Sequence, residues 1–192
     1  MMPTTEEQVK AEILKAALGL YRKSGPAKVT LANLAAATGR SRSSLYYYFK
    51  DRDAIFEAVM EAIAVEVIAE IRREVQAQEV LADRIDAFCR TKIKTTRDWK
   101  RVFDAVDQSV DPKEHSWHTK FLDALHRRLI HLERGILEEA IGNREGKEVD
   151  LLIFLISSGV RGIRREIDDH GDPHAVKKAT QLFSLIVADY LV

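Results

Sequence analysis

Residues 30–49, TLANLAAATGRSRSSLYYYF, constrain the fold of this chain more than any other stretch. Two short helices joined by a tight turn must cross closely, and the crossing needs a small side chain where they touch. Ala35 meets that need, and Gly39 can adopt the left-handed backbone that turns the chain. Leu34 and Leu45 then supply inward apolar side chains from the first and second helices. This spacing predicts a helix-turn-helix.

Hydroxyl and carboxylate residues stand where helices of this region are expected to begin. Thr30 and Ser41 precede the two short helices, and Asp51 precedes a long helical pattern that starts at residue 52. Side-chain oxygens at such positions accept hydrogen bonds from the first free backbone amides of a helix. We therefore expect Thr30, Ser41 and Asp51 to be N-caps.

The rest of the chain also has helical periodicity, and its 192 residues include only four prolines and nine glycines. Besides the two short helices we expect helices at about 5–24, 52–78, 83–95, 99–110, 117–142, 148–171 and 174–192. The predicted fold is all-α with about nine helices. A helix-turn-helix domain of three helices is expected at residues 1–50 and a larger helical domain at residues 51–192.

Charge is unevenly distributed along the chain. The whole sequence balances 30 Lys and Arg against 30 Asp and Glu, but residues 1–52 hold nine basic and four acidic residues, a local charge of +5. A basic first quarter on a body of net charge −5 indicates a module that meets a polyanion. The alternative is a chance clustering of solvated lysines.

Residues 40–52 resemble the DNA-binding domain of the TetR family of transcriptional repressors. RSRSSLYYYF matches the family's recognition segment, with Arg40, Ser43, Ser44 and Arg52 where its commonest wording has valine, glycine, threonine and lysine. The resemblance covers about a quarter of the chain once the first helix is included, and the helical remainder is similar in architecture and length. It implies an N-terminal DNA-binding domain and a C-terminal domain that dimerises and binds a ligand.

The recognition helix is expected to divide its contacts with DNA. Arg42 can present a bidentate fork to guanine, and short serines after it can approach bases or phosphates. The resemblance implies that Tyr46 and Tyr48 contact phosphates and that Tyr47 lies against the groove wall or a thymine methyl. For any one tyrosine, the alternative is packing against the first or fourth helix.

Residues on either side of this helix are expected to hold the DNA backbone. The helix capped by Thr30 should direct its N-terminus at a phosphate, and Lys50 with Arg52 should clamp the strand. Arg40 either packs its stem and projects its head, or adds a DNA contact. The predicted DNA-binding residues are Thr30, Arg40, Arg42, Ser43, Ser44, Tyr46, Tyr47, Tyr48, Lys50 and Arg52.

The last two predicted helices are apolar nearly all round, in LLIFLIS and LFSLIVADYLV, whereas a helix packed on one core needs only an apolar stripe. One interpretation is a central helix enclosed by its own chain. The other is a two-fold homodimer interface built as a four-helix bundle. The predicted interface residues are Leu151, Leu155, Ser158, Leu182, Leu185 and Ile186.

A ligand-responsive repressor also needs an internal pocket of mixed polarity among its middle helices. The candidate lining residues, each of which plain core packing would also explain, are Phe88, Cys89, Phe103, Trp117, Phe121, Leu125 and His126. With such a pocket, the protein would be a repressor that binds a palindromic operator as a homodimer and responds to a small-molecule effector. The alternative is a structural or assembly DNA-binding protein on the same fold that senses nothing.

Other classes of function have little support in the sequence. The only cluster with metal-ligand character, DPKEHSWH, has no second group of ligands, so we expect no metal, cofactor or enzymatic activity. A single cysteine excludes an internal disulfide and fits a reducing cytoplasm. The N-terminus lacks a signal-peptide pattern, and the longest apolar run is about half the ~20 residues of a membrane span. A soluble cytoplasmic protein is expected.

Overall fold

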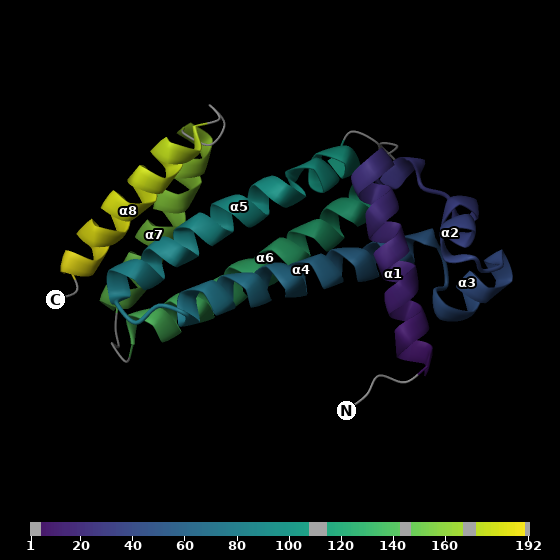
Figure 1. The fold of residues 1–192 in the computed structure, drawn as a ribbon, viewed down its shortest axis with the longest axis horizontal. Helices are drawn as coiled ribbons and strands as arrows, with labels where there is room; N and C mark the ends of the chain where they lie inside the picture. Colours follow the sequence, from purple (N-terminus) through teal and green to yellow (C-terminus); the bar gives the residue numbers. More distant parts are fainter. Residues whose placement is uncertain (1–4, 108–114, 143–146, 167–171, 191–192) are drawn as a thin grey trace. The chain divides into compact units, whose positions relative to one another are not determined.

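The computed structural model describes residues 5–107, 115–142, 147–166 and 172–190, and in these ranges every regular element is helical (Figure 1). The predicted all-α fold is therefore confirmed. The elements are α1 (Thr5–Ser24), the 3₁₀ helix η1 (Pro26–Lys28), α2 (Leu31–Thr38), α3 (Arg42–Tyr48), α4 (Arg52–Gln76), α5 (Leu81–Asp107), α6 (His115–Ile141), α7 (Lys147–Glu166) and α8 (Pro173–Tyr190).

The described part of the chain has eight α-helices where about nine were expected, because the helices predicted at 83–95 and 99–110 are one continuous helix, α5. The polar run KTTRD between them contains no glycine or proline to break the helix. The Thr95 hydroxyl donates to the carbonyl of Thr91 at 2.9 Å, and the Thr96 hydroxyl donates to the carbonyl of Lys92 at 2.7 Å. These bonds satisfy both hydroxyls inside the helix, so the predicted break was wrong.

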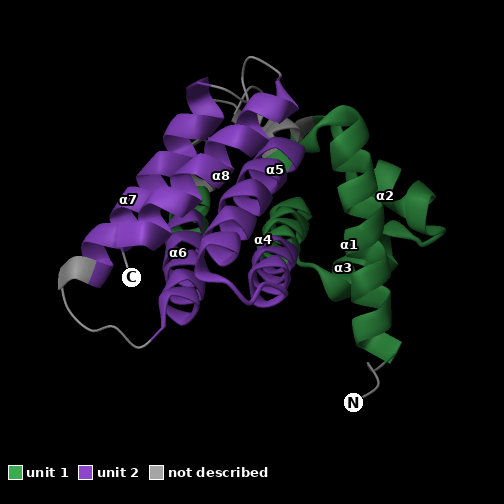
Figure 2. Ribbon diagram, turned by 60° about the vertical axis from the view of Figure 1, so that its left-hand side comes forward, with its two compact units in different colours: residues 1–64, 99–125 green, residues 65–98, 126–192 purple. Residues whose placement is uncertain are grey.

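The chain divides into two compact units, which Figure 2 distinguishes by colour. Unit 1 comprises residues 1–64 and 99–125, and unit 2 comprises residues 65–98 and 126–192. Helices α4, α5 and α6 each contribute residues to both units. The functional boundary expected at residue 50 is a different division of the chain, and it stays a prediction.

The core of unit 1 joins α1 to the helix-turn-helix and to the first part of α4. Its fully buried side chains belong to α1, α2, α3 and α4: Ile13, Ala17, Leu34, Leu45, Ile55 and Met60. The periodic apolar stripe of each helix supplies these residues, as amphipathic packing requires. The two helices of the helix-turn-helix are therefore held by apolar contacts within their own unit.

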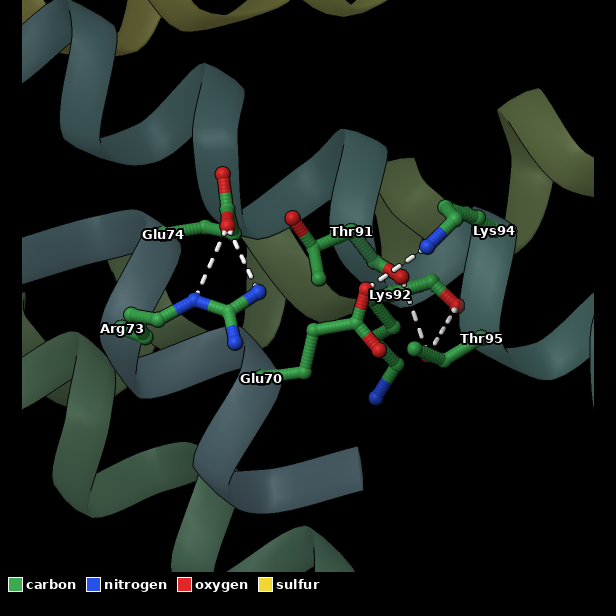
Figure 3. A network of polar contacts seen from close by, with 7 residues as sticks. All are labelled: Glu70, Arg73, Glu74, Thr91, Lys92, Lys94 and Thr95. Atoms are coloured by element: carbon green, nitrogen blue, oxygen red, sulfur yellow. Dashed lines mark hydrogen bonds and ion pairs between the residues drawn. The ribbon is translucent and has the colours of Figure 1, made fainter. Parts of the chain in front are cut away.

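Unit 2 surrounds a second apolar core to which α4–α8 all contribute, with Ile71, Phe88, Leu137, Ile156 and Val187 among its members. Ion pairs connect its helices: Lys94 of α5 lies 2.7 Å from Glu70 of α4, and Lys92 of α5 pairs with Glu133 of α6. Figure 3 shows Lys94 directed at Glu70, with the Thr95 hydroxyl directed at its own helix. The hydrogen bond from Lys94 to Glu70 raises the pKa of Lys94, so this lysine is held charged.

Helices α7 and α8 lie side by side in unit 2 (Figures 1 and 2). Phe183 of α8 packs directly over Gly159 of α7, where no side chain is in the way. No helix within the described ranges is long and apolar enough to cross a membrane.

Candidate nucleic-acid interface

Helix α2 begins with a capping box at Thr30. The Thr30 hydroxyl accepts a hydrogen bond from the backbone amide of Asn33 at 3.2 Å, and the Thr30 amide donates to Oδ1 of Asn33 at 2.9 Å. This reciprocal pair satisfies amides at the start of the helix. The helix ends at Gly39, whose φ of 65° is left-handed. Both the N-cap and the turning glycine expected from the sequence are confirmed.

Helix α3 begins at the expected N-cap as well, since the Ser41 hydroxyl accepts from the amide of Ser44 at 3.1 Å. Leu45 is completely buried, as is Leu34 of the neighbouring helix α2. Phe49 lies one residue beyond the end of α3 and is half-buried. Leu45 is therefore the main anchor of α3, and Phe49 assists it from the following loop.

The outer side of α3 presents hydroxyl, guanidinium and phenol groups. Arg42 and Ser43 are exposed in the first turn, and Tyr46 and Tyr47 are 53% and 75% exposed. Tyr48 is half-buried and meets Tyr47 edge-on, with 4.9 Å between ring centroids. The three consecutive tyrosines thus have two kinds of environment, as their spacing of about 100° around a helix requires.

The residues expected to flank the DNA backbone differ in exposure. Thr30 and Lys50 are exposed, whereas Arg52 is half-buried at the start of α4. Asp51 caps that helix, because its Oδ1 accepts from the amide of Ala54 at 2.8 Å. Arg40 is half-buried, and its Nη2 donates to Oε2 of Glu12 at 2.8 Å. Each predicted DNA contact stays a prediction.

Sequence reasoning missed the role of α1 in holding this surface. Glu12, the partner of Arg40, lies 28 residues away in sequence, and no local pattern connects the two. Tyr21 of α1 is buried with its ring 6.3 Å from that of Phe56 on α4, and burial raises the pKa of Tyr21 to about 12. Arg22 stacks over the Trp99 ring at 4.6 Å. A buried tyrosine and a cation–π pair add to the apolar packing of α1.

The residues proposed to line a ligand pocket are divided between the two units. Phe88 and Cys89 are completely buried in the core of unit 2, and burial raises the pKa of the Cys89 thiol to about 12. Leu125 is buried in unit 1, where the half-buried Phe121 meets Phe56 edge-on at 6.3 Å. His126 of unit 2 is exposed rather than internal. Two further candidates, Phe103 and Trp117, have side chains outside the described part of the structure.

The cluster DPKEHSWH receives no structural test as a metal site. Asp111 and Glu114 lie outside the described residues, as do the side chains of His115 and His118. Elsewhere, among the residues that the structure describes, no three His, Cys, Asp or Glu side chains are grouped so that they could hold a metal ion.

A buried leucine, a left-handed glycine and an outward face of arginine, serine and tyrosine define a helix-turn-helix. Residues 13–59 match the family model described as "Bacterial regulatory proteins, tetR family". These residues match the regulatory domain of the TetR family, so the resemblance inferred from the sequence is confirmed.

A curated relative supports the same assignment. Over 72 residues the chain is 31% identical to the HTH-type transcriptional regulator AcrR of Shigella flexneri, a match that covers 38% of this chain and 33% of that protein. The similarity therefore spans about a third of the length of the relative.

Solved structures share the fold over nearly the whole chain. A tetR-family transcriptional regulator from Streptomyces coelicolor superposes with a TM-score of 0.67 at 16% identity, covering 94% of this chain and 84% of the other. The transcriptional regulator FadR from Bacillus subtilis, solved in complex with stearoyl-CoA, superposes with a TM-score of 0.57 at 14% identity, covering 95% and 97%. At these identities the likeness shows a common fold.

Proposed function

We propose that this protein is a repressor that binds a palindromic operator as a homodimer and releases it when a small molecule binds the larger helical domain. The observation that carries the proposal is the outer face of α3, where Arg42, Ser43, Tyr46 and Tyr47 are all exposed. A helix of this kind fits the major groove, where side chains at its N-terminal end meet base edges. Residues 1–50 form the DNA-binding domain in this proposal.

Within α3, the exposed Arg42 is the residue best placed to recognise bases. It stands at the first position of the helix, and its guanidinium has the fork geometry that pairs with guanine. Tyr46 and Tyr47 project their phenols further along the helix and can donate to phosphates on either side of the groove. Tyr48 is half-buried, so it offers less surface to DNA than Tyr46 and Tyr47 do.

Support for the homodimer comes from α7 and α8. Apolar side chains on these two helices remain exposed within the chain: Leu151 (56%), Phe154 (61%), Leu155 (46%), Leu182 (60%), Leu185 (59%), Ile186 (62%) and Tyr190 (67%). An exposed apolar surface on two adjacent helices is typical of an interface between subunits. Two copies related by a two-fold axis would cover it with a four-helix bundle.

Two residues of this face change the list of interface residues predicted from sequence. Phe154 adds a large exposed side chain that the prediction omitted. Ser158 is half-buried, and its hydroxyl accepts from Arg161 at 2.9 Å, so the serine belongs to the rim of the proposed interface. Leu151, Leu155, Leu182, Leu185 and Ile186 keep their proposed places in it.

Support for an effector comes from the shared fold, because the FadR structure holds stearoyl-CoA. The ligand of the present protein need not be the same molecule, and we propose that it binds among the C-terminal helices. A ligand that prefers a conformer with mis-spaced recognition helices lowers operator affinity by its differential affinity for the two states. Helix α4 contributes residues to both compact units, so it is the proposed lever.

The proposal is tested by footprinting the full-length protein on DNA that flanks its own gene. We expect two protected half-sites of inverted sequence, centred ~34–36 Å or a multiple apart. Metabolite pools added to the complex should then release the protein. Equal binding to all duplexes would contradict operator recognition. If no metabolite mixture released the protein from its operator, the alternative of a DNA-binding protein that senses no ligand would be favoured.

A further inference from the structure

We propose that Arg40 is a positioning residue, which fixes the helix-turn-helix to α1 through Glu12, and that it makes no contact with DNA phosphate. The inference rests on the proposed DNA-binding function and assigns a role within that site. Arg40 is the single residue between Gly39, which ends α2, and Ser41, which caps α3. A bond to its side chain therefore acts on the turn that sets the angle between the two helices.

The geometry of Arg40 directs its guanidinium toward α1. Nη2 of Arg40 donates to Oε2 of Glu12 at 2.8 Å, and the arginine side chain is only 28% exposed. Its Nε is fully covered and, among the described residues, has no hydrogen-bond partner. A covered Nε holds the root of the guanidinium inside the unit, so the head cannot swing freely outward.

The burial of Nε indicates that the Arg40 side chain is held in one position. Leaving a buried donor without a partner is unfavourable, and a free arginine on a surface would avoid that cost by turning into water. Here the backbone amide of Arg40 is also engaged, donating to the carbonyl of Ala35 at 3.0 Å. Main chain and side chain of the turn residue are thus held at once, one by α2 and the other by α1.

A turn held in this way presents the N-terminus of α3 in one orientation relative to α1. Ser41, Arg42 and Ser43 follow Arg40 directly, and Arg42 is the proposed base-reading residue. Loss of the clamp would let these residues sample more orientations, and the affinity for the correct sequence would fall. Non-specific binding depends on summed charge, so it would change much less.

Substitution of Glu12 distinguishes a phosphate contact by Arg40 from a positioning role, because the two roles predict opposite changes in operator affinity. If Arg40 contacts phosphate, Glu12→Gln frees the arginine and removes a negative charge near DNA, so operator affinity rises. If Arg40 positions the turn, Glu12→Gln weakens operator binding by about two- to fivefold, the equivalent of an exposed ion pair of up to about 1 kcal/mol. Glu6→Gln is the matched control, because Glu6 is also an α1 acid but pairs with Lys10 of the same helix at 2.9 Å.

The salt dependence of binding gives a second, independent readout. Each phosphate contact contributes about 0.9 to the slope of log affinity against log salt concentration. Arg40→Gln should therefore weaken operator binding and leave this slope unchanged. The exchange Glu12→Arg with Arg40→Glu reverses the pair and should restore most of the operator affinity lost in either single variant.

The measurements are made on the full-length protein by fluorescence anisotropy, with the footprinted operator and a scrambled duplex, after thermal unfolding has shown that each variant folds. The positioning role of the Arg40–Glu12 pair is supported if operator affinity falls in Glu12→Gln, is unchanged in Glu6→Gln and recovers in the charge-exchanged double variant. Tighter or unchanged binding by Glu12→Gln, or a slope reduced by about 0.9 in Arg40→Gln, overturns it. Failure of the wild-type protein to prefer any duplex would instead contradict the proposed function.

Discussion

A methyl group on Gly159 of α7 would lie 2.5 Å from Cζ of Phe183 on α8. Real Cβ atoms essentially never approach another atom so closely, so the phenylalanine ring occupies the space that any other residue would need. The glycine therefore allows α7 and α8 to approach closely at this point of unit 2.

We therefore expect Gly159→Ala to be less stable than Gly162→Ala by about 1–3 kcal/mol, the usual cost of overpacking, because the Phe183 ring has to move. Gly162→Ala is the control in the same helix, because a Cβ there meets nothing within 4 Å. That change should be neutral or stabilise the helix by up to about 1 kcal/mol. Urea denaturation of the three proteins measures the difference, and equal stability of the two variants would contradict the packing argument.

Arg42→Ala should reduce the preference for operator over scrambled DNA by about 1–3 kcal/mol, because a bidentate contact to guanine is lost. Lys50→Ala should lower the affinity for both duplexes alike and reduce the salt slope by about 0.9. Both residues are exposed, so neither change should affect folding. Binding titrations at several salt concentrations distinguish the two behaviours. Equal losses on both duplexes for Arg42→Ala would exclude base reading by this residue.

Leu185→Asp places a charge in the exposed apolar face of α7 and α8, where Leu185 is 59% exposed in the single chain. We expect a monomer, or insoluble protein, because burying an unpaired carboxylate in an interface is costly. Val80→Asp is the control, since Val80 is equally exposed at 60% but lies between α4 and α5. Light scattering coupled to size exclusion reports the mass of each. A dimer of wild-type size from Leu185→Asp would refute this interface.

Alkaline pH should destabilise the fold through Tyr21. The pKa of this buried phenol is raised from 10.0 to about 12, so folding favours its neutral form. The stabilisation is complete below pH 10 and is lost as pH rises through about 12, by up to about 3 kcal/mol in all. The Cys89 thiol, raised from 9.0 to about 12, adds a loss of the same sign.

Urea denaturation at pH 9 and pH 11 measures this loss, and Tyr21→Phe should show a smaller decrease between the two values than the wild-type protein does. An identical decrease in both proteins would show that Tyr21 is not the group that titrates.

The helix-turn-helix could be predicted in detail because its determinants are local. Thr30, Gly39 and Ser41 act on backbone groups within five residues of themselves, so residue type and spacing were sufficient. The split predicted in α5 was wrong. The sequence contains two amphipathic stretches with a polar run between them, but the Thr95 and Thr96 hydroxyls in that run bond to their own helix once it is formed.

The sequence by itself determined the fold class, the helix-turn-helix and its resemblance to the TetR family, since periodicity, capping and turn chemistry depend on near neighbours. Only the tertiary structure decided which side chains are covered. It pairs Arg40 with Glu12, 28 residues away in sequence. It covers half of Tyr48 but leaves Tyr46 and Tyr47 exposed, and it leaves Leu182, Leu185 and Ile186 exposed as well. Burial and long-range ion pairs depend on which helices pack together, and the spacing of residues along one helix does not specify which other helices pack against it.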